Sequence, residues 1–435
     1  MRTSNNKRWY LSLAALFCAA LCLNAQSFQE GFFLRNYNQA YRYNPAFVGN
    51  DFLSILQINN SLQNNVGAKS FLFPMDDGSL VTGLHASVPA STFPGMLPES
   101  CRFRGDLNIG LFAYGFRKGD AFHTFELNAR VLYGVSVPKQ LFELAKLGTG
   151  SGTVKVGDFR LDAGLFAELA YGYGRRLNDW LSVGGRAKIL LPMYGGLFDI
   201  SKLYLTASEE ELSIGYLGEL YATSRKGGMK MFNGAGLAAD LGLVATPAEG
   251  LTLSLSLLDL GGMYWYYGYR GSSSGPFTFN GFADITSDQL NAQSLKDMLL
   301  GKGKELLNVV KPVQLDGKWR WQLLNMEANL GMKYEMPFYR RLAVGATGRY
   351  LRTAGLPYWE GRLGLDINPL DWLDLTGNLG YGTHGRVWGV AASVKLGHFR
   401  VTGGVQNGFG GTIPKKSILL APNFKSFSFG LSYDL

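Results

Sequence analysis

The chain has 435 residues, and its 42 Lys and Arg against 33 Asp and Glu give a formal net charge of +9. This basic excess is modest and contains no Lys/Arg block, which argues against nucleic acid as a partner. The 57 glycines and the 13% of aromatic residues are typical of many curved strands with aromatic girdles, although the length would also fit two or three soluble domains.

The N-terminus has the pattern of a secretory signal peptide. Basic residues precede an apolar run from Trp9 to Leu23, and Ala25 is a small residue where a signal peptidase would cut. We therefore expect residues 1–25 to be removed. The mature chain then keeps one cysteine, Cys101, so no intramolecular disulfide is predicted. After the signal, no uninterrupted apolar stretch is long enough for a membrane-spanning helix.

From residue 52 onward, apolar and polar residues alternate with period two in many segments. The clearest runs from Phe125 to Val137, which is longer than a typical strand of about five or six residues. The pattern predicts fourteen strands, at 52–58, 107–116, 125–137, 161–173, 181–191, 237–244, 251–257, 326–334, 342–351, 363–367, 373–381, 388–396, 399–405 and 427–435. A further strand pair that includes residues 80–88 would make sixteen.

The connections between these segments alternate in length. Short turns are predicted at 117–120, 175–180, 246–250, 336–341, 367–372 and 396–399. Long connections are predicted at 60–105, 138–160, 192–233, 266–324 and 406–424. Outer-membrane barrels have short periplasmic turns and longer extracellular loops. The segregation of the two sets therefore favours such a barrel over a soluble sandwich.

One face of the predicted strands is apolar, whereas the other carries charges of both signs, such as Glu126, Arg130 and Lys188. A ring of fourteen strands encloses a lumen too wide to be filled by apolar side chains alone, so lipid is the natural partner of the apolar face. We predict an all-β fold: a transmembrane antiparallel up-and-down β-barrel at residues 52–435, preceded by a periplasmic or hatch segment at 26–51.

Two segments in the long connections have helical patterns. Residues 138–148 have a proline near the predicted helix start and a glycine just after its end. Residues 287–310 place Leu295, Met298 and Leu299 on one stripe. We expect both to be short helices in the extracellular loops, as external caps or inward-folded plugs.

The last strand alternates strictly. Phe427, Phe429, Leu431, Tyr433 and Leu435 would face lipid, while the serines between them face the lumen. This strand resembles the C-terminal signal by which barrel-assembly machinery recognises outer-membrane barrels. We therefore predict that the protein is located in the outer membrane, with outer-membrane lipid and the barrel-assembly machinery as its partners.

Motifs for other chemistry are weak. The G-x-G-x-x-G pattern at 380–385 lies between two strands with no helix after it, which favours a hairpin turn over a dinucleotide site. The four histidines form no metal-ligand pair, and no G-x-S-x-G elbow is present. We predict no enzyme, cofactor or metal, although lumen carboxylates such as Glu168 and Asp240 could converge. The segment from Met263 to Tyr269 is expected to form an aromatic girdle rather than a sugar-stacking platform.

Before the first strand stands Asn44-Pro45-Ala46-Phe47. Asn-Pro-Ala is similar to a motif in the N-terminal hatch of the FadL-like transporters of hydrophobic compounds, which are fourteen-stranded barrels. Its alternative interpretation is a turn into the first strand. The segments 137–142, 172–188 and 256–261 resemble an uncharacterised FadL-related family common in Bacteroidota, which is distantly similar to type IX secretion barrel subunits. The resemblance implies a hatch on the ligand path and no particular substrate.

Two functional hypotheses follow. The first is passive transport of a hydrophobic small molecule through a plugged lumen, with Asn44, Pro45, Ala46 and Phe47 at the exit. Lumen charges of mixed sign argue against an open ion-selective porin, whose constriction would favour one sign. The alternative is a barrel subunit that docks an envelope protein partner in a secretion or envelope-assembly machine.

Overall fold

The computed structural model describes most of the chain after the predicted signal peptide. The described residues are 29–35, 37–66, 70–76, 80–147, 152–156, 158–207, 212–223, 231–279, 312–353, 356–383, 385–409 and 424–435. The predicted signal peptide at 1–25 and the predicted helix at 287–310 lie outside these residues.

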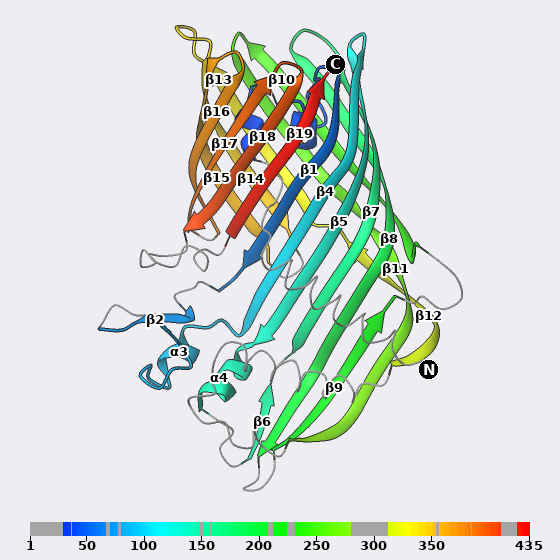
Figure 1. Ribbon diagram of the computed structural model, residues 1–435, viewed down its shortest axis with the longest axis vertical. Helices are drawn as coiled ribbons and strands as arrows, with labels where there is room; N and C mark the ends of the chain where they lie inside the picture. The colour runs from blue at the N-terminus through cyan, green and yellow to red at the C-terminus, as the bar shows by residue number, and fades with distance from the viewer. Residues whose placement is uncertain are drawn as a thin grey trace.

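The main sheet closes on itself as an antiparallel ring (Figure 1). In the described residues the ring has fourteen strands, as the sequence predicted. In order around the ring they are β1 (Phe52–Asn64), β4 (Ser100–Lys118), β5 (Ala121–Pro138), β7 (Phe159–Arg176), β8 (Leu181–Ala207), β10 (Gly234–Ala248), β11 (Leu251–Phe279), β13 (Met326–Glu335), β14 (Leu342–Arg352), β15 (Tyr358–Leu370), β16 (Leu373–Gly382), β17 (Gly385–Leu396), β18 (Phe399–Phe409) and β19 (Phe424–Asp434). Pairing of Phe52 with Asp434 and of Ile58 with Phe429 joins β1 to β19 and closes the ring.

Among the described residues, five further strands lie outside the ring. The strands β6 (Gly152–Val156), β9 (Leu212–Ala222) and β12 (Pro312–Leu323) extend the sheet where the wall is tallest. The strands β2 (Leu72–Pro74) and β3 (Leu80–Thr82) form a separate two-stranded sheet. The alternative of sixteen strands is therefore wrong, because β3 pairs with β2 and not with the ring.

The two ends of the barrel differ. At the short-turn end, tight turns join consecutive strands, and Gly119, Gly250 and Gly397 adopt positive φ there. At the long-loop end, β8 and β11 continue far beyond their predicted ends, so much of the predicted loops at 192–233 and 266–324 is strand. Two connections at this end, 353–357 and 383–384, are also short. The second is the hairpin predicted at the G-x-G-x-x-G pattern, where Gly382 pairs with Gly385.

Helices are few and short in the described residues. They are α2 (Glu30–Phe33), the 3-10 helix η1 (Ala40–Arg42), α3 (Thr92–Gly95) and α4 (Lys139–Leu147). The helix α4 lies in the β5–β6 connection, within the segment 138–148 that has the helical pattern. No described helix has the length and hydropathy needed to cross a membrane.

The strand faces are inverted relative to a soluble protein. Leu363 and Leu379 lie on the outer face and are each 71% exposed. Arg362, which is next to Leu363 in β15, points inward and is only 2% exposed. In the last strand, Phe427 points outward and Ser426 and Ser428 are buried on the inner face. The alternation read from the sequence is therefore confirmed. A polar interior and an apolar exterior suit a barrel whose surroundings are lipid.

A β-bulge in β11 exchanges its two faces. Ala239 of β10 pairs with Leu260 of β11, but Leu241 pairs with Leu257, so two residues of β11 lie opposite Asp240 alone. One of these two, Asp259, has a φ of 58°. Before the bulge, the residues of even number face inward. After it, those of odd number do, since the inserted residue shifts the period-two pattern by one.

This exchange corrects one sequence prediction. The segment from Met263 to Tyr269 was expected to form an outward girdle, but Met263, Trp265 and Tyr267 are 0%, 1% and 6% exposed and lie inside the barrel. On the outer face, Tyr264 remains 50% exposed. The apolar–polar alternation breaks at Leu258-Asp259 in the sequence, and the bulge at this point turned half of the aromatic run inward.

The N-terminal segment, residues 29–51, lies inside the ring at the short-turn end. Figure 1 shows it in dark blue, enclosed by the strands. Phe32, Phe33 and Tyr43 are almost fully buried and form one apolar cluster, against which Phe47 packs. Hydrogen bonds reach from this segment to strands as distant in sequence as β13 and β15. The segment therefore fills the short-turn end of the lumen.

Candidate functional site

The lumen is divided into layers along the barrel axis. Following β8 from the short-turn end, the inward positions carry Gly184, then Arg186 and Lys188, then Leu190, and finally Leu197. The inward positions of β7 follow the same order from the short-turn end: a glycine, then Glu168, then Phe166 and finally Asp162. The layers are thus the N-terminal segment, a charged layer, an apolar layer and a cavity near the long-loop end.

The Asn44 side chain anchors the N-terminal segment to the barrel wall. It is 0% exposed, and its amide nitrogen donates to the carbonyl oxygen of Leu243 and to the hydroxyl of Ser254, each at 2.8 Å. Its amide oxygen accepts a hydrogen bond from the backbone N–H of Ala46 at 2.9 Å. Both halves of the amide are therefore satisfied, one by the wall and one by a local turn of the kind that Asn forms.

Glycines on the wall make room for this turn. A Cβ at Gly242 would lie 1.9 Å from the Asn44 amide oxygen, and one at Gly184 would lie 2.2 Å from the carbonyl oxygen of Pro45. Such distances are far inside van der Waals contact, so only glycine allows the segment to approach so closely. The Asn-Pro-Ala motif and these glycines, which are far apart in the sequence, form one contact.

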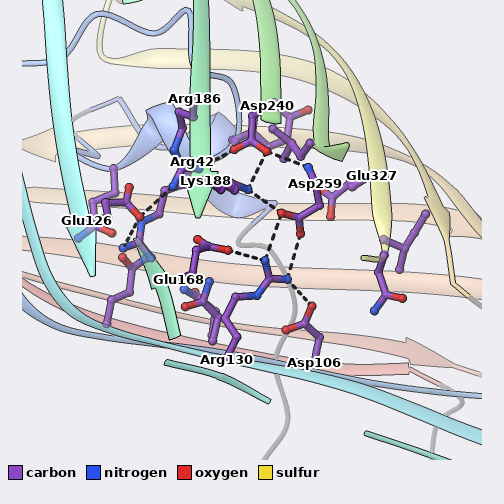
Figure 2. A pocket seen from close by; sticks show the side chains of 18 of the residues that line it. Arg42, Asp106, Glu126, Arg130, Glu168, Arg186, Lys188, Asp240, Asp259 and Glu327 are labelled. Atoms are coloured by element: carbon purple, nitrogen blue, oxygen red, sulfur yellow. Dashed lines mark hydrogen bonds and ion pairs between the residues drawn. The ribbon is translucent and has the colours of Figure 1, made fainter. Parts of the chain in front are cut away.

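Next to the segment lies a cluster that we call the central charge network (Figure 2). It lines a cavity of about 100 Å³. Its members come from β4, β5, β7, β8, β10, β11 and η1, and are Arg42, Asp106, Glu126, Arg130, Glu168, Arg186, Lys188, Asp240 and Asp259. Acids and bases alternate in space, so each charge taken from water is compensated by neighbours.

Arg130 is the most connected cation of the network. Its guanidinium lies 2.7 Å from Asp106, 2.9 Å from Glu168 and 3.0 Å from Asp259. Lys188 bridges two further acids, at 2.7 Å from Asp240 and 2.6 Å from Asp259. The network therefore ties strands on several sides of the lumen to one another.

The N-terminal segment takes part in the network through Arg42. Its guanidinium lies 3.2 Å from Glu126, which also pairs with Arg186 at 2.9 Å. The Arg186 guanidinium lies 5.6 Å from the centre of the Tyr41 ring, within the range of a cation–π contact. Removal of the segment would leave Glu126 with one cation fewer.

A second charge cluster holds the start of the segment on the opposite wall. Glu30 pairs with Arg362 at 3.1 Å, and Arg362 pairs with Glu360 at 2.7 Å. Gln406 and Asn378 donate hydrogen bonds to the same Glu30 carboxylate. Complete burial raises the pKa of Glu30 above its ordinary value, although the Arg362 charge acts in the opposite direction. These contacts attach the segment to β15, β16 and β18.

Beyond the central charge network the lumen becomes apolar. Leu132, Phe166, Leu190 and Met263 are nearly or fully buried and belong to one cluster with Trp265. The Arg130 guanidinium lies 5.5 Å from the Phe166 ring centre, so the two layers are in direct contact. An apolar lumen surface of this kind offers contact to molecules that do not require hydrogen bonds.

A larger cavity, of about 330 Å³, opens beside this apolar layer toward the long-loop end. Trp265 and Tyr267 form an aromatic wall, with ring centres 6.3 Å apart and an interplanar angle of 19°. Arg104, Arg160 and Arg320 also line it, together with one acid, Asp162. We call it the arginine cavity.

The predicted site residues lie in two places. Asn44, Pro45, Ala46 and Phe47 are together inside the short-turn end, whereas Phe427, Phe429, Leu431, Tyr433 and Leu435 form the outer face of β19 and its end. Glu168 and Asp240 do converge, since both belong to the central charge network. Sequence reasoning missed the arginine cavity, because Arg104, Arg160, Trp265 and Tyr267 lie beyond the ends of the predicted strands and Arg320 lies on β12, which the pattern did not predict.

Comparison with known proteins gives a family but no curated relative. Residues 45–405 match the model of a family described as a family of unknown function, DUF5723. Among curated proteins, none matches the sequence.

Solved structures of similar architecture include a hydrocarbon channel and a toluene transporter. A mutant of the monoaromatic hydrocarbon channel TodX is 10% identical, with a TM-score of 0.50, 92% of this chain covered and 95% of that chain. TodX of Pseudomonas putida, described as a toluene transporter, is 10% identical with a TM-score of 0.48, covering 94% of this chain and 98% of that one. A FadL homologue of Pseudomonas aeruginosa is 14% identical with a TM-score of 0.47, covering 94% and 97%. At these identities the similarity shows the fold alone.

Proposed function

The chain belongs to this family of unknown function, DUF5723, and we propose that it is an outer-membrane barrel through which a hydrophobic small molecule passes by passive transport. The short-turn end would face the periplasm and the long-loop end the exterior, as in barrels of this kind. The observation that carries the proposal is the combination of an apolar lumen layer with an N-terminal segment that fills the exit below it. An open aqueous porin would have neither.

The order of the layers supports a route. A molecule from outside would meet the arginine cavity, then the apolar layer, and then the central charge network with the N-terminal segment behind it. Each charge of the central charge network has an ion-pair partner, so an apolar molecule gains nothing there, and the N-terminal segment closes the way behind it. Passage to the periplasm therefore requires the segment to move, and we propose Asn44, Pro45, Ala46 and Phe47 as the part that moves.

We propose transport rather than catalysis. Glu168 lies 2.9 Å from Arg130, and Asp240 lies 2.7 Å from Lys188. Carboxylates paired in this way compensate buried cations, and the described residues place no nucleophile with a base beside them. The neighbours' descriptions as hydrocarbon channels agree with the general class of cargo, but the proposal depends on the lumen of this chain.

The test is uptake by intact Gram-negative cells that express the chain. The probe is N-phenylnaphthylamine, an apolar dye that lipopolysaccharide excludes and that fluoresces once it reaches phospholipid. We expect faster dye uptake than in cells without the protein. Leu132→Asp, which places a charge in the apolar layer, should reduce this uptake, whereas Leu132→Met, which conserves the volume, should not.

Two results would contradict the proposal. One is dye uptake equal to that of cells without the protein. The other is a large, constant conductance of the purified wild-type chain in planar bilayers, which would show an open pore. Copurification of a stoichiometric envelope protein, without any gain in dye uptake, would favour the alternative hypothesis of a docking subunit.

A further inference from the structure

The arginine cavity has donors that no described acceptor satisfies by a hydrogen bond. The Nε atoms of Arg104 and Arg160 are buried and have no hydrogen-bond partner among the described residues, although the Arg160 Nε lies 3.6 Å from the Asp162 carboxylate. Arg320 faces the same space, because it pairs in register with the inward Trp265, and no described acid lies within ion-pair distance of it. Buried donors without acceptors are costly, but Arg42, Arg130 and Arg186 also have unsatisfied Nε atoms, so Arg320 is what distinguishes this cavity.

The charges in this region do not balance. Arg104 lies 2.6 Å from Asp162, and Arg160 lies 3.6 Å from Asp162 and 3.9 Å from Asp199. Among the described residues, two acids thus compensate two of the arginines, and Arg320 is left over. This contrasts with the central charge network, where every cation has acidic partners. One uncompensated cation fits a ligand that carries a single negative charge.

The rest of the cavity is apolar and aromatic. Leu132, Leu197, Trp265 and Tyr267 line it on the inner face. The Trp265 indole N–H already donates to Gln322 at 2.6 Å, so it is not free to bind a ligand. Arg320 pairs in register with Trp265 on the neighbouring strand, which places the cation beside the aromatic wall. The volume of about 330 Å³ is at the small end of ligand sites, which suits a compact molecule rather than a long chain.

We propose that the arginine cavity binds a compact amphiphilic monoanion, with an aromatic or otherwise apolar body and one carboxylate. The body lies against Trp265 and Tyr267, and the carboxylate accepts hydrogen bonds from Arg320 and from the free donors of Arg104 and Arg160. This inference rests on the proposed function, because it names the class of molecule that the lumen would select at its outer entrance.

The test compares two probes with the same body. The full chain is embedded in phospholipid nanodiscs, and the affinities of 4-phenylbutyrate and the neutral 4-phenylbutan-1-ol are measured by saturation-transfer NMR titration. We expect the carboxylate to bind at least about tenfold more tightly than the alcohol, as a charge-assisted hydrogen bond would provide. Arg320→Gln should remove most of this preference without changing the affinity for the alcohol, and Arg320→Lys should keep part of it.

A matched control is Arg340→Gln, since Arg340 is exposed at the short-turn end and pairs only with Glu249, also exposed, among the described residues. It should leave both affinities unchanged. A heat-dependent mobility shift in gels confirms that each variant is folded. Equal affinities for the two probes in the wild type, or a preference that survives Arg320→Gln, would overturn the inference while leaving the dye-uptake test of transport intact. Absence of binding by both probes would also overturn it, and loss of dye uptake alone would count against transport only.

Discussion

The carboxylate of Asp240 accepts a hydrogen bond from the backbone N–H of Asp259 at 2.8 Å. This contact holds the bulge of β11, where Asp259 has a positive φ that a residue other than glycine rarely adopts. The bulge directs the Asp259 carboxylate between Arg130 and Lys188 and, beyond it, turns Trp265 inward. One backbone irregularity thus shapes both the central charge network and the arginine cavity.

Asp259→Asn should destabilise the barrel. It keeps the size of the side chain but leaves Arg130 and Lys188 with less compensation, and removing one partner of a buried ion pair costs about 3–5 kcal/mol. Urea unfolding of the protein reconstituted in lipid vesicles measures the change in the free energy of unfolding. Asp371→Asn is the control, because the Asp371 side chain is 90% exposed in its pair with Arg341 and should change little. Equal effects of the two substitutions would show that the network does not contribute to stability.

Asn44→Ala should loosen the N-terminal segment. The variant loses the hydrogen bonds to the Leu243 carbonyl and the Ser254 hydroxyl, which then have fewer partners. We expect the free energy that holds the segment against the wall to fall by roughly 2 kcal/mol. We expect faster proteolysis of residues 29–51 and intermittent openings in planar bilayers. Gln140→Ala, in helix α4, which has no buried residue and lies in the β5–β6 connection, should show neither effect. A conductance trace identical to that of the wild type would count against a plugging role.

Gly242→Ala should release the same segment by a steric route. Its Cβ would lie 1.9 Å from the Asn44 amide oxygen, so the motif must leave its position. At Gly377, by contrast, a Cβ would meet nothing closer than 3.9 Å, which makes Gly377→Ala the matched control in another strand. Proteolysis and conductance are again the measurements. If the two alanine variants behave alike, the close approach of Asn44 and Pro45 to the wall is refuted.

The ion pair of Arg42 with Glu126 should couple the segment to the wall. A double-mutant cycle with Arg42→Gln and Glu126→Gln measures this coupling without assigning it to either residue alone. We expect an interaction energy between 0.5 and about 3 kcal/mol in lipid-reconstituted unfolding, as for residues in one charge network. The same cycle on the exposed pair of Arg340 and Glu249 should give a value near zero. Additive effects of the Arg42 and Glu126 substitutions would rule out the coupling.

The outer face of the last strand should serve assembly. Phe427→Ser removes an aromatic residue that is 42% exposed, whereas Ser428→Ala alters a buried inner-face residue. If assembly machinery reads the outer face, the first substitution lowers the amount of folded protein in the outer-membrane fraction, and the second does not. Quantitative immunoblotting of heat-modifiable protein is the measurement. Equal amounts of both variants would contradict the predicted role of Phe427, Phe429, Leu431, Tyr433 and Leu435.

Much of the fold was predictable because a strand in a barrel wall is half inside and half outside. Apolar and polar residues therefore alternate along each strand with a period of two. The segments predicted on this basis at 125–137 and 342–351 both match strands of the ring. Strand ends were less predictable. Beyond Leu191, β8 continues to Ala207, although its residues no longer alternate clearly between apolar and polar. The alternation pattern therefore did not predict the tall wall around the arginine cavity.

By itself, the sequence predicted an antiparallel barrel of about fourteen strands, the inner and outer faces of most of them and the presence of mixed charges inside. These follow from local alternation, which each strand carries independently. The tertiary structure decided which charges meet, such as Arg130 and Asp259, 129 positions apart. It also decided which face Trp265 presents after the bulge, and that the N-terminal segment lies against Gly184 and Gly242. These depend on register and closure, which bring distant strands together and leave no periodic trace in the chain.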